Sequence, residues 1–304
     1  MGIGTGYEKP LTRREDLLAI ISNISPVDTP LFTMAAKRKA TNTTHSWIKE
    51  TLEAPTVGGE IDGADTSFSS YTYNPGDRVN NYTHIMKEIW GLADGEAETS
   101  AADGKTMKAR EIWRKTRQLS RKIELNLIQS TAAAGNGTSV ARTMMGLDEF
   151  LTTNVLDNSG TARDLTETVL LDGLQLVWEQ GATPEIVLCH AYTKRQISGF
   201  TSNTKNVNAD AKKLVNVVDV YESPFGTVTI KIERYVPNTA NNTTLYAGQK
   251  DLIGVAFRRK PKNVDLAKTG DSTKGHVITE LTLEVLNEAG WVKIEDLNAV
   301  YVAP

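Results

Sequence analysis

Cys189 and His190 are adjacent residues whose types are suited to nucleophilic catalysis, because an imidazole can take the proton of a thiol and leave a reactive thiolate. They close an apolar run, Ile186-Val187-Leu188, that predicts a buried strand. Adjacent side chains on a strand point to opposite faces. We therefore expect Cys189 to be a small buried hydrophobic residue and not half of a catalytic dyad.

Two glycine-rich segments imitate parts of nucleotide-binding motifs. Gly2-Ile3-Gly4-Thr5-Gly6 has neither a preceding strand nor a following helix, which a dinucleotide fingerprint requires. Gly270–Gly275 lacks the Gly-Lys-Ser/Thr ending of a phosphate-binding loop. No Gly-x-Ser-x-Gly segment is present to place a nucleophilic serine. The motifs therefore predict no bound nucleotide and no serine hydrolase.

Metal-ligating residue types are scattered along the chain. Four histidines and one cysteine show none of the spacings that zinc sites use. Asp62 and Asp65 lie in a Gly- and acid-rich segment where nothing buries them, so we expect solvated carboxylates, with weak cation binding as the lesser alternative. A single cysteine forms no internal disulfide and suits a reducing cytoplasm. The sequence predicts no catalytic residues, no metal and no cofactor.

Charge is divided between two segments. The stretch 103–124 has eight basic residues against three acidic ones, and the basic ones are Lys105, Lys108, Arg110, Arg114, Lys115, Arg117, Arg121 and Lys122. The stretch 46–80 has six acidic residues against two basic ones, and the acidic ones are Glu50, Glu53, Glu60, Asp62, Asp65 and Asp77. Three explanations of these charges are open. The first is two solvated faces, the second is an acidic loop lying on the basic segment of a neighbouring copy, and the third is contact of the basic segment with nucleic acid.

The overall composition argues against the third explanation as a sequence-specific function. The chain has 304 residues and a net charge of −3, and Trp113 is the only aromatic residue among the clustered basic ones. The hydrophobic fraction of 39% is ordinary for a globular protein. No signal peptide and no apolar run of membrane-spanning length is present.

The elements that position these charges differ along the chain. Residues 1–45, interrupted by prolines, predict an extended arm that needs another surface, and residues 46–95 predict a projecting hairpin with an irregular tip. Apolar residues at three- and four-residue steps predict a helix from Thr106 to Thr131, or more widely about 97–131.

The second half of the chain predicts a small α/β layer followed by strands. We expect a helix from Glu167 to Gln180 capped by Thr166 and stopped by Gly181, the strand 186–189, and a second helix from Tyr192 to Gly199. Alternation around Val228–Ile232 and an apolar run at Leu252–Phe257 predict strands, and Leu281–Val285 with Trp291–Ile294 predicts a hairpin.

Several motifs together resemble the major capsid proteins of tailed bacteriophages. The resemblance begins with Asn23-Ile24-Ser25-Pro26-Val27-Asp28-Thr29-Pro30-Leu31-Phe32 and continues through the basic stretch 37–39 to His45-Ser46-Trp47. It extends to Met145-Gly146-Leu147-Asp148, to Pro184–Leu188 and to Lys194–Phe200, so it spans most of the chain.

This resemblance implies an α+β fold of the Hong Kong 97 phage type. Its expected parts are an N-terminal arm (1–45), an extended E-loop hairpin (46–95), the spine-helix segment of a P-domain (96–150), an axial α/β A-domain (151–244) and P-domain strands beside the spine helix (245–304). It implies a structural protein that forms pentamers and hexamers of an icosahedral or prolate head around double-stranded DNA, within a virion assembled in the host bacterial cytoplasm. The expected partners are further copies of the chain, packaged DNA in non-specific contact, and portal, scaffolding or decoration proteins, with no membrane.

Some family features are not carried over, and rivals remain. Lys49 is the only lysine near the hairpin tip and no motif marks a partner, so no covalent cross-link is expected. The chain begins at the arm without a long charged helical prefix, which implies a separate scaffolding protein or none. An encapsulin-like compartment shares the fold but needs a cargo pocket, a soluble α/β enzyme needs converging polar groups, and a tail tube protein lacks a spine helix.

Overall fold

The predicted long helix is α3, Met107–Gln129, in a computed structural model of the chain. The structure describes residues 28–52, 54–55, 57–59, 62–63, 65, 72–97, 106–200, 219–239, 242–268 and 270–299. Thr106 caps the helix by accepting a hydrogen bond from the Ala109 N–H at 3.3 Å. The helix is about 34 Å long. It ends slightly before the expected Thr131 because Ser130 adopts an extended conformation with ψ 137°.

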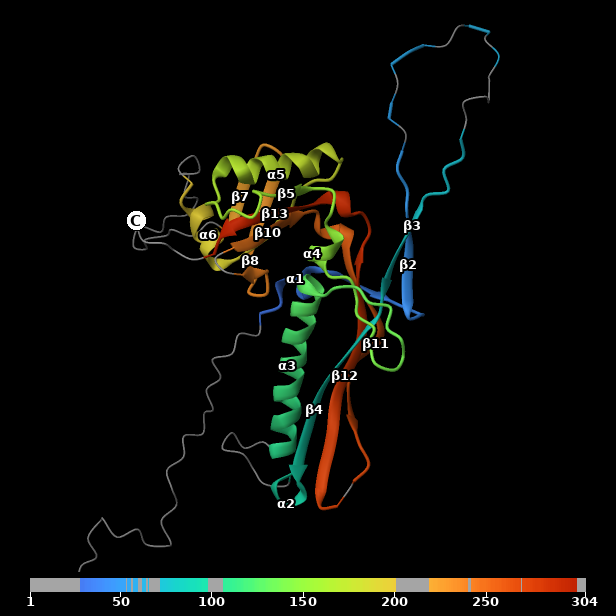
Figure 1. Cartoon of the computed structure of the whole chain (residues 1–304), viewed down its shortest axis with the longest axis vertical. Coiled ribbons are helices and arrows are strands. Elements are labelled where there is room, and N and C mark those ends of the chain that lie inside the picture. The colour runs from blue at the N-terminus through green and yellow to red at the C-terminus, as the bar shows by residue number, and fades with distance from the viewer. Residues whose placement is uncertain are drawn as a thin grey trace, which may run out of the picture.

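A four-stranded sheet lies beside this helix, in the order β1-β11-β12-β4 (Figure 1). Its strands are β1 Ala36–Lys39, β11 Ile253–Asp265, β12 Ser272–Val285 and β4 His84–Ala93. The β1–β11 pair is parallel and the other two pairs are antiparallel. The short helix α2, Asp94–Ala97, follows β4 at the far end of the sheet. Helix and sheet pack together through a continuous apolar cluster that includes Leu119, Ile123 and Leu127.

The second sheet of the chain has seven strands, in the order β5-β13-β10-β6-β8-β7, with β9 paired to β10. Its strands are β5 Val155–Leu156, β13 Trp291–Asn298, β10 Asn242–Gly248, β6 Ile186–Cys189, β8 Gly226–Ile232, β7 Val220–Ser223 and β9 Asn238–Thr239. The helices α5, Glu167–Glu179, and α6, Ala191–Ser198, pack against it. Thr166 caps α5 and Gly181 follows its end with φ +83°, as predicted. The strand β6 and the helix α6 also lie where the sequence predicts them, so all three elements are confirmed.

The predicted hairpin of Leu281–Val285 with Trp291–Ile294 is wrong. β12 belongs to the four-stranded sheet, whereas β13 pairs with β10 and β5 in the other sheet. The short 3₁₀ helix η3, Glu288–Gly290, turns the chain between the two sheets, and the buried Trp291 then donates its indole N–H to the Gln249 carbonyl at 2.9 Å. Of the strands expected to return beside the long helix, only β11 and β12 do so.

The projecting hairpin is present, with a break that the sequence pattern did not show. β2, Thr44–Lys49, pairs with β3, Asp77–Tyr82, and the described loop residues between them extend away from both sheets (Figure 1). The expected hairpin spans residues 46–95, but its second strand, β3, is shorter than that range allows. It stops at the buried Thr83, whose hydroxyl bonds Glu280 at 2.8 Å, and β4 continues in the four-stranded sheet.

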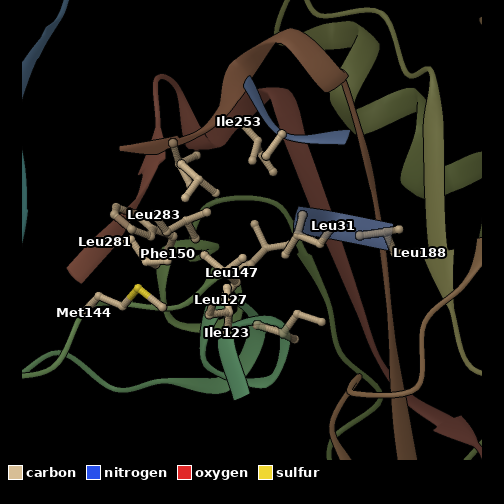
Figure 2. Close-up of a cluster of buried hydrophobic side chains, with 14 of the residues drawn as sticks. Leu31, Ile123, Leu127, Met144, Leu147, Phe150, Leu188, Ile253, Leu281 and Leu283 are labelled. Carbon is tan, nitrogen blue, oxygen red and sulfur yellow. The ribbon is translucent and has the colours of Figure 1, made fainter. Parts of the chain in front are cut away.

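The end of the expected N-terminal arm is built into the body of the chain. Residues 1–27 lie outside the described part, but α1, Pro30–Met34, and β1 pack on the same subunit. Figure 2 shows Leu31 of α1 within the core cluster, together with Ile123 and Leu127 of α3. The same cluster includes Leu147 of α4, Leu147–Phe150. For residues 30–39 the surface that the arm needs is the chain's own core.

Candidate assembly surfaces

The loop between β2 and β3 holds carboxylates and apolar side chains open to solvent. Leu52, Val57 and Tyr73 have exposed fractions of 93%, 107% and 73%. The described carboxylates of the loop and of the first position of β3 are also exposed, and no salt bridge within the described chain involves them: Glu50, Asp62, Asp65 and Asp77. The predicted Glu53 and Glu60 lie outside the described residues. Exposed apolar side chains among unpaired charges are typical of a surface that another molecule covers.

Several basic residues of α3 have partners within the subunit that the sequence did not reveal. Lys108 pairs with Asp265 of β11 at 2.9 Å, and Lys122 pairs with Glu88 of β4 at 3.0 Å. Arg121 donates to the Tyr235 hydroxyl at 3.0 Å. The helix is therefore less strongly cationic than its sequence indicates.

The remaining basic residues of the helix are less strongly engaged. Arg114 pairs at 2.8 Å with Glu111 on the same helix, and its side chain is about half exposed. Arg117 lies over the Trp113 ring at 4.3 Å. Arg110 and Lys115 are partly buried, and the predicted Lys105 lies outside the described residues. Arg114 and Arg117 are thus the cations of α3 that are best placed to meet another molecule.

The acidic loop and the basic helix do not meet within one chain. Figure 1 places the described loop residues and the N-terminal end of α3 at opposite ends of the molecule. A contact between them therefore requires a second copy.

A buried carboxylate, Glu280, forms a charge cluster that no pattern in the sequence indicates. Its side chain is fully buried and accepts hydrogen bonds from Arg142 at 2.7 Å, Arg258 at 2.9 Å and Arg259 at 2.7 Å. Burial alone would raise the pKa of Glu280, but hydrogen bonds from Arg258, Thr83 and Arg259 outweigh it and lower that pKa. The three arginines come from two distant segments, so no local motif marks the cluster.

A second buried carboxylate, Glu124, lies on the core-facing side of α3. In the sequence it counted only as an acidic residue opposing the basic stretch. Burial, together with hydrogen bonding to and repulsion from the neighbouring Glu233 carboxyl, raises its pKa to about 9. Burial also raises the pKa of Glu233. Two such carboxyls favour one shared proton at neutral pH.

The expected burial of Cys189 is confirmed. Its side chain is fully buried and burial raises the pKa of the thiol to about 12. His190 instead caps α6, accepting a hydrogen bond from the Tyr192 N–H at 3.4 Å. Within the described ranges no group of three or more His, Cys, Asp or Glu side chains is arranged to hold a metal ion. None of the described helices is both long and apolar enough to span a bilayer.

The order of these parts, a hairpin, a long helix beside one sheet and an α/β layer, is what the resemblance implied. A model of the family described as SU10 major capsid protein matches residues 2–298. The chain belongs to this family. It is a structural protein of a phage capsid. No curated protein matches the chain by sequence.

Solved capsids share the fold of this major capsid protein. The capsid of a native GTA particle is 13% identical with a TM-score of 0.67, over 94% of this chain and 95% of that one. The capsid of cyanophage A-1(L) is 14% identical with a TM-score of 0.67, over 94% and 97%. The predicted Hong Kong 97-type fold is confirmed.

The same fold also occurs in a shell of another kind. The SrpI encapsulin of Synechococcus elongatus is 11% identical with a TM-score of 0.60, over 97% of this chain and 95% of that one. The fold alone therefore does not separate the two kinds of shell, and the family match assigns this chain to the phage capsid proteins.

Proposed function

We propose that this capsid protein assembles into pentamers and hexamers that close into an icosahedral or prolate head around double-stranded DNA. The observation that carries the proposal is the β2–β3 loop, where the described residues of the subunit leave Leu52, Val57 and Tyr73 exposed. A loop of this kind can bind a surface of the next copy, and each copy provides both the loop and the surface that receives a neighbour's loop. Such head-to-tail contacts close into rings when the rotation between copies allows.

We assign the chain the five parts that the resemblance implies. The arm is 1–45, the E-loop hairpin 46–95, the spine-helix segment 96–150, the axial domain 151–244 and the returning P-domain strands 245–304. The pairing of β13 with β10 supports a modified last boundary, because residues 291–298 then belong with the axial domain.

The acidic loop is proposed to lie on α3 of a neighbouring copy. The loop residues of this contact are Glu50, Glu53, Glu60, Asp62, Asp65 and Asp77, and the helix residues are Lys105, Lys108, Arg110, Arg114, Arg117, Arg121 and Lys122. Arg114 and Arg117 carry most of the attraction, because they are exposed. Lys108, Arg121 and Lys122 are only partly exposed and bond residues outside the helix. Exposed pairs contribute only about 0–1 kcal/mol each, so the contact sets register by its repetition around the shell.

The shell would be a component of the virion, assembled in the host bacterial cytoplasm with portal, scaffolding or decoration proteins. The role is structural and needs neither catalysis nor a cofactor.

Replacing residues 51–75 by a short Gly-Ser turn tests the proposal. The variant should give a folded subunit with unchanged far-UV circular dichroism in its helical bands, but no rings or shells in sedimentation analysis. A variant that assembles like the unaltered protein would contradict the role assigned to the loop. Nuclease-protected DNA within shells, against a protein cargo in its place, distinguishes a phage head from an encapsulin-like compartment.

A further inference from the structure

The outer edge of the four-stranded sheet is densely basic on a chain that is acidic overall. The adjacent parallel strands β1 and β11 hold seven cationic residues, which are Lys37, Arg38, Lys39, Arg258, Arg259, Lys260 and Lys262. No acidic residue occurs at positions 36–49 or 253–264. The whole chain has 34 basic against 37 acidic residues, so this edge departs sharply from the average.

A groove lies at this edge where β1 ends beside β11. It measures about 620 Å³ and is lined by Lys39, Ala40, Thr41, Arg258 and Arg259. The Ala40 N–H donates to the Phe257 carbonyl at 3.0 Å, which fixes one wall of the groove against the other. The walls are therefore backbone held by the sheet, and the cations project from a rigid support.

A β-bulge aims the two arginines of the groove. Consecutive side chains on a regular strand point to opposite faces, yet Arg258 and Arg259 both bond Glu280. The register of β11 against β12 shifts between Phe257 and Arg259 and again before Lys262, and such bulges redirect side chains. The strand thus departs from regular geometry at the point where it brings two guanidinium groups together.

The cluster retains surplus positive charge. Three arginines surround the single carboxylate of Glu280, and the side chains of Arg258 and Arg259 remain 38% and 41% exposed. Each guanidinium has five N–H donors and a planar fork that suits phosphate oxygens. Lys39, Lys260 and Lys262 are exposed nearby, whereas Lys37 and Arg38 are engaged with Phe32 and Glu284.

We infer that this groove and the basic edge around it bind the phosphate backbone of double-stranded DNA. Duplex DNA presents about one negative charge per 1.7 Å, a density that matches closely spaced cations on two neighbouring strands. The acidic loop of another copy is the competing occupant. Its six carboxylates are spread over residues 50–77, and it supplies a lower charge density. Contacts with phosphates alone fix position without reading sequence, as a protein that packages a whole genome requires.

The inference rests on the proposed function for the presence of DNA, and it is tested on the unassembled full-length subunit. A labelled duplex of about 20 base pairs is titrated by fluorescence anisotropy between about 50 and 200 mM salt. Lys39→Glu/Lys260→Glu should weaken binding at the lowest salt by tenfold or more. It should also make the slope of log affinity against log salt shallower by about 2, at about 0.9 per lost phosphate contact. Lys39→Arg/Lys260→Arg should bind like the unaltered protein, and two unrelated duplexes should bind equally.

The matched control places the same charge change elsewhere. Lys231 of β8 and Lys250 of η2, Lys250–Leu252, are exposed residues outside the four-stranded sheet. Lys231→Glu/Lys250→Glu should leave the salt slope unchanged. An equal loss in this control, or no loss in the Lys39/Lys260 variant, would overturn the inference. Tighter binding of a peptide of residues 50–77 that displaces the duplex would also overturn it, in favour of a second copy. Electron microscopy of the same proteins reports shell formation separately, so a failure to assemble is not confused with a failure to bind DNA.

Discussion

The side chain of Glu124 accepts a hydrogen bond from the backbone N–H of Leu31 at 2.7 Å, across 93 positions of sequence. Its second oxygen accepts the Phe32 N–H at 2.9 Å. Both donors belong to the first turn of α1, where N–H groups have no partner within the helix. Thr29 precedes this helix but its side chain makes no cap. A residue of the long helix therefore caps α1 and fixes the point at which the N-terminal segment enters the core.

The first prediction concerns this cap and pH. The folded state holds the pKa of Glu124 near 9, above its usual value, so it binds more protons than the unfolded chain. The stability from this site is present below the unfolded pKa of about 4.3 and is lost as pH rises towards 9. Glu124→Gln should cost about 1 kcal/mol at pH 6, since one acceptor is lost, and should flatten the decline between pH 6 and pH 9.

Urea unfolding of the unassembled subunit at both pH values measures this effect. Glu222→Gln, at an exposed carboxylate on β7, is the control and should retain the pH dependence of the unaltered protein. An equally steep decline in Glu124→Gln would show that another group titrates.

The second prediction concerns the buried carboxylate among three arginines. Glu280→Gln keeps the shape but removes the negative charge, and should cost about 2–4 kcal/mol at pH 7. The folded pKa of Glu280 is lowered, so its contribution is present above the unfolded pKa and is lost as pH falls below about 4. The difference between variant and unaltered protein should therefore shrink on acidification. Asp265→Asn breaks an exposed ion pair with Lys108 and should cost much less, because solvent screens that pair. Equal losses in the two variants by chemical denaturation would refute the distinction.

The third prediction concerns Gly146, which belongs to one of the motifs that the chain shares with the family. Gly146 donates its N–H to the Ser130 carbonyl at 2.6 Å, and a Cβ there would lie 2.7 Å from both the Ile128 oxygen and the Ser130 nitrogen. These are backbone atoms that cannot rotate away. Gly146→Ala should destabilise the subunit by about 1–3 kcal/mol. Thermal unfolding of the subunit measures this effect. Gly59→Ala, where no atom lies within 4 Å of the new Cβ, is the control and should leave the stability unchanged. A neutral Gly146→Ala would mean that the helix end and the turn before α4 can separate.

The fourth prediction tests the proposed contact between copies. Asp62→Lys/Asp65→Lys should raise the subunit concentration needed for assembly by about tenfold or more, since several weak ion pairs are lost together. Arg114→Glu/Arg117→Glu should do the same, and combining the four changes should restore part of the assembly. Arg121→Glu is a poorer probe because it also breaks the bond to Tyr235. Light scattering follows assembly, and circular dichroism shows that each subunit is folded. If the variant with all four changes assembles no better than either double variant, the loop binds a surface other than α3.

Elements with local signals were predictable from sequence. Thr166 and Gly181 bound α5 because capping and a positive φ are decided within one turn of the chain. The β12–β13 hairpin was wrong because strand pairing is decided by distant partners, and β10 pairs with β13 instead.

The candidate surfaces divide in the same way. The acidic loop was predictable, because a Gly-rich segment without apolar periodicity has nothing to bury it. The partners of the helix cations were not predictable, because Asp265 and Glu88 reach Lys108 and Lys122 from strands far away in sequence. Glu280 and its arginines, together with the bulge that aims two of them, depend on packing alone.

Electron microscopy of the overexpressed full-length protein tests the central claim most directly. We expect closed shells, or rings of five and six subunits, because a neighbouring copy covers the exposed apolar side chains of the β2–β3 loop. A folded protein that stays monomeric at high concentration, in the presence and absence of DNA, would contradict it.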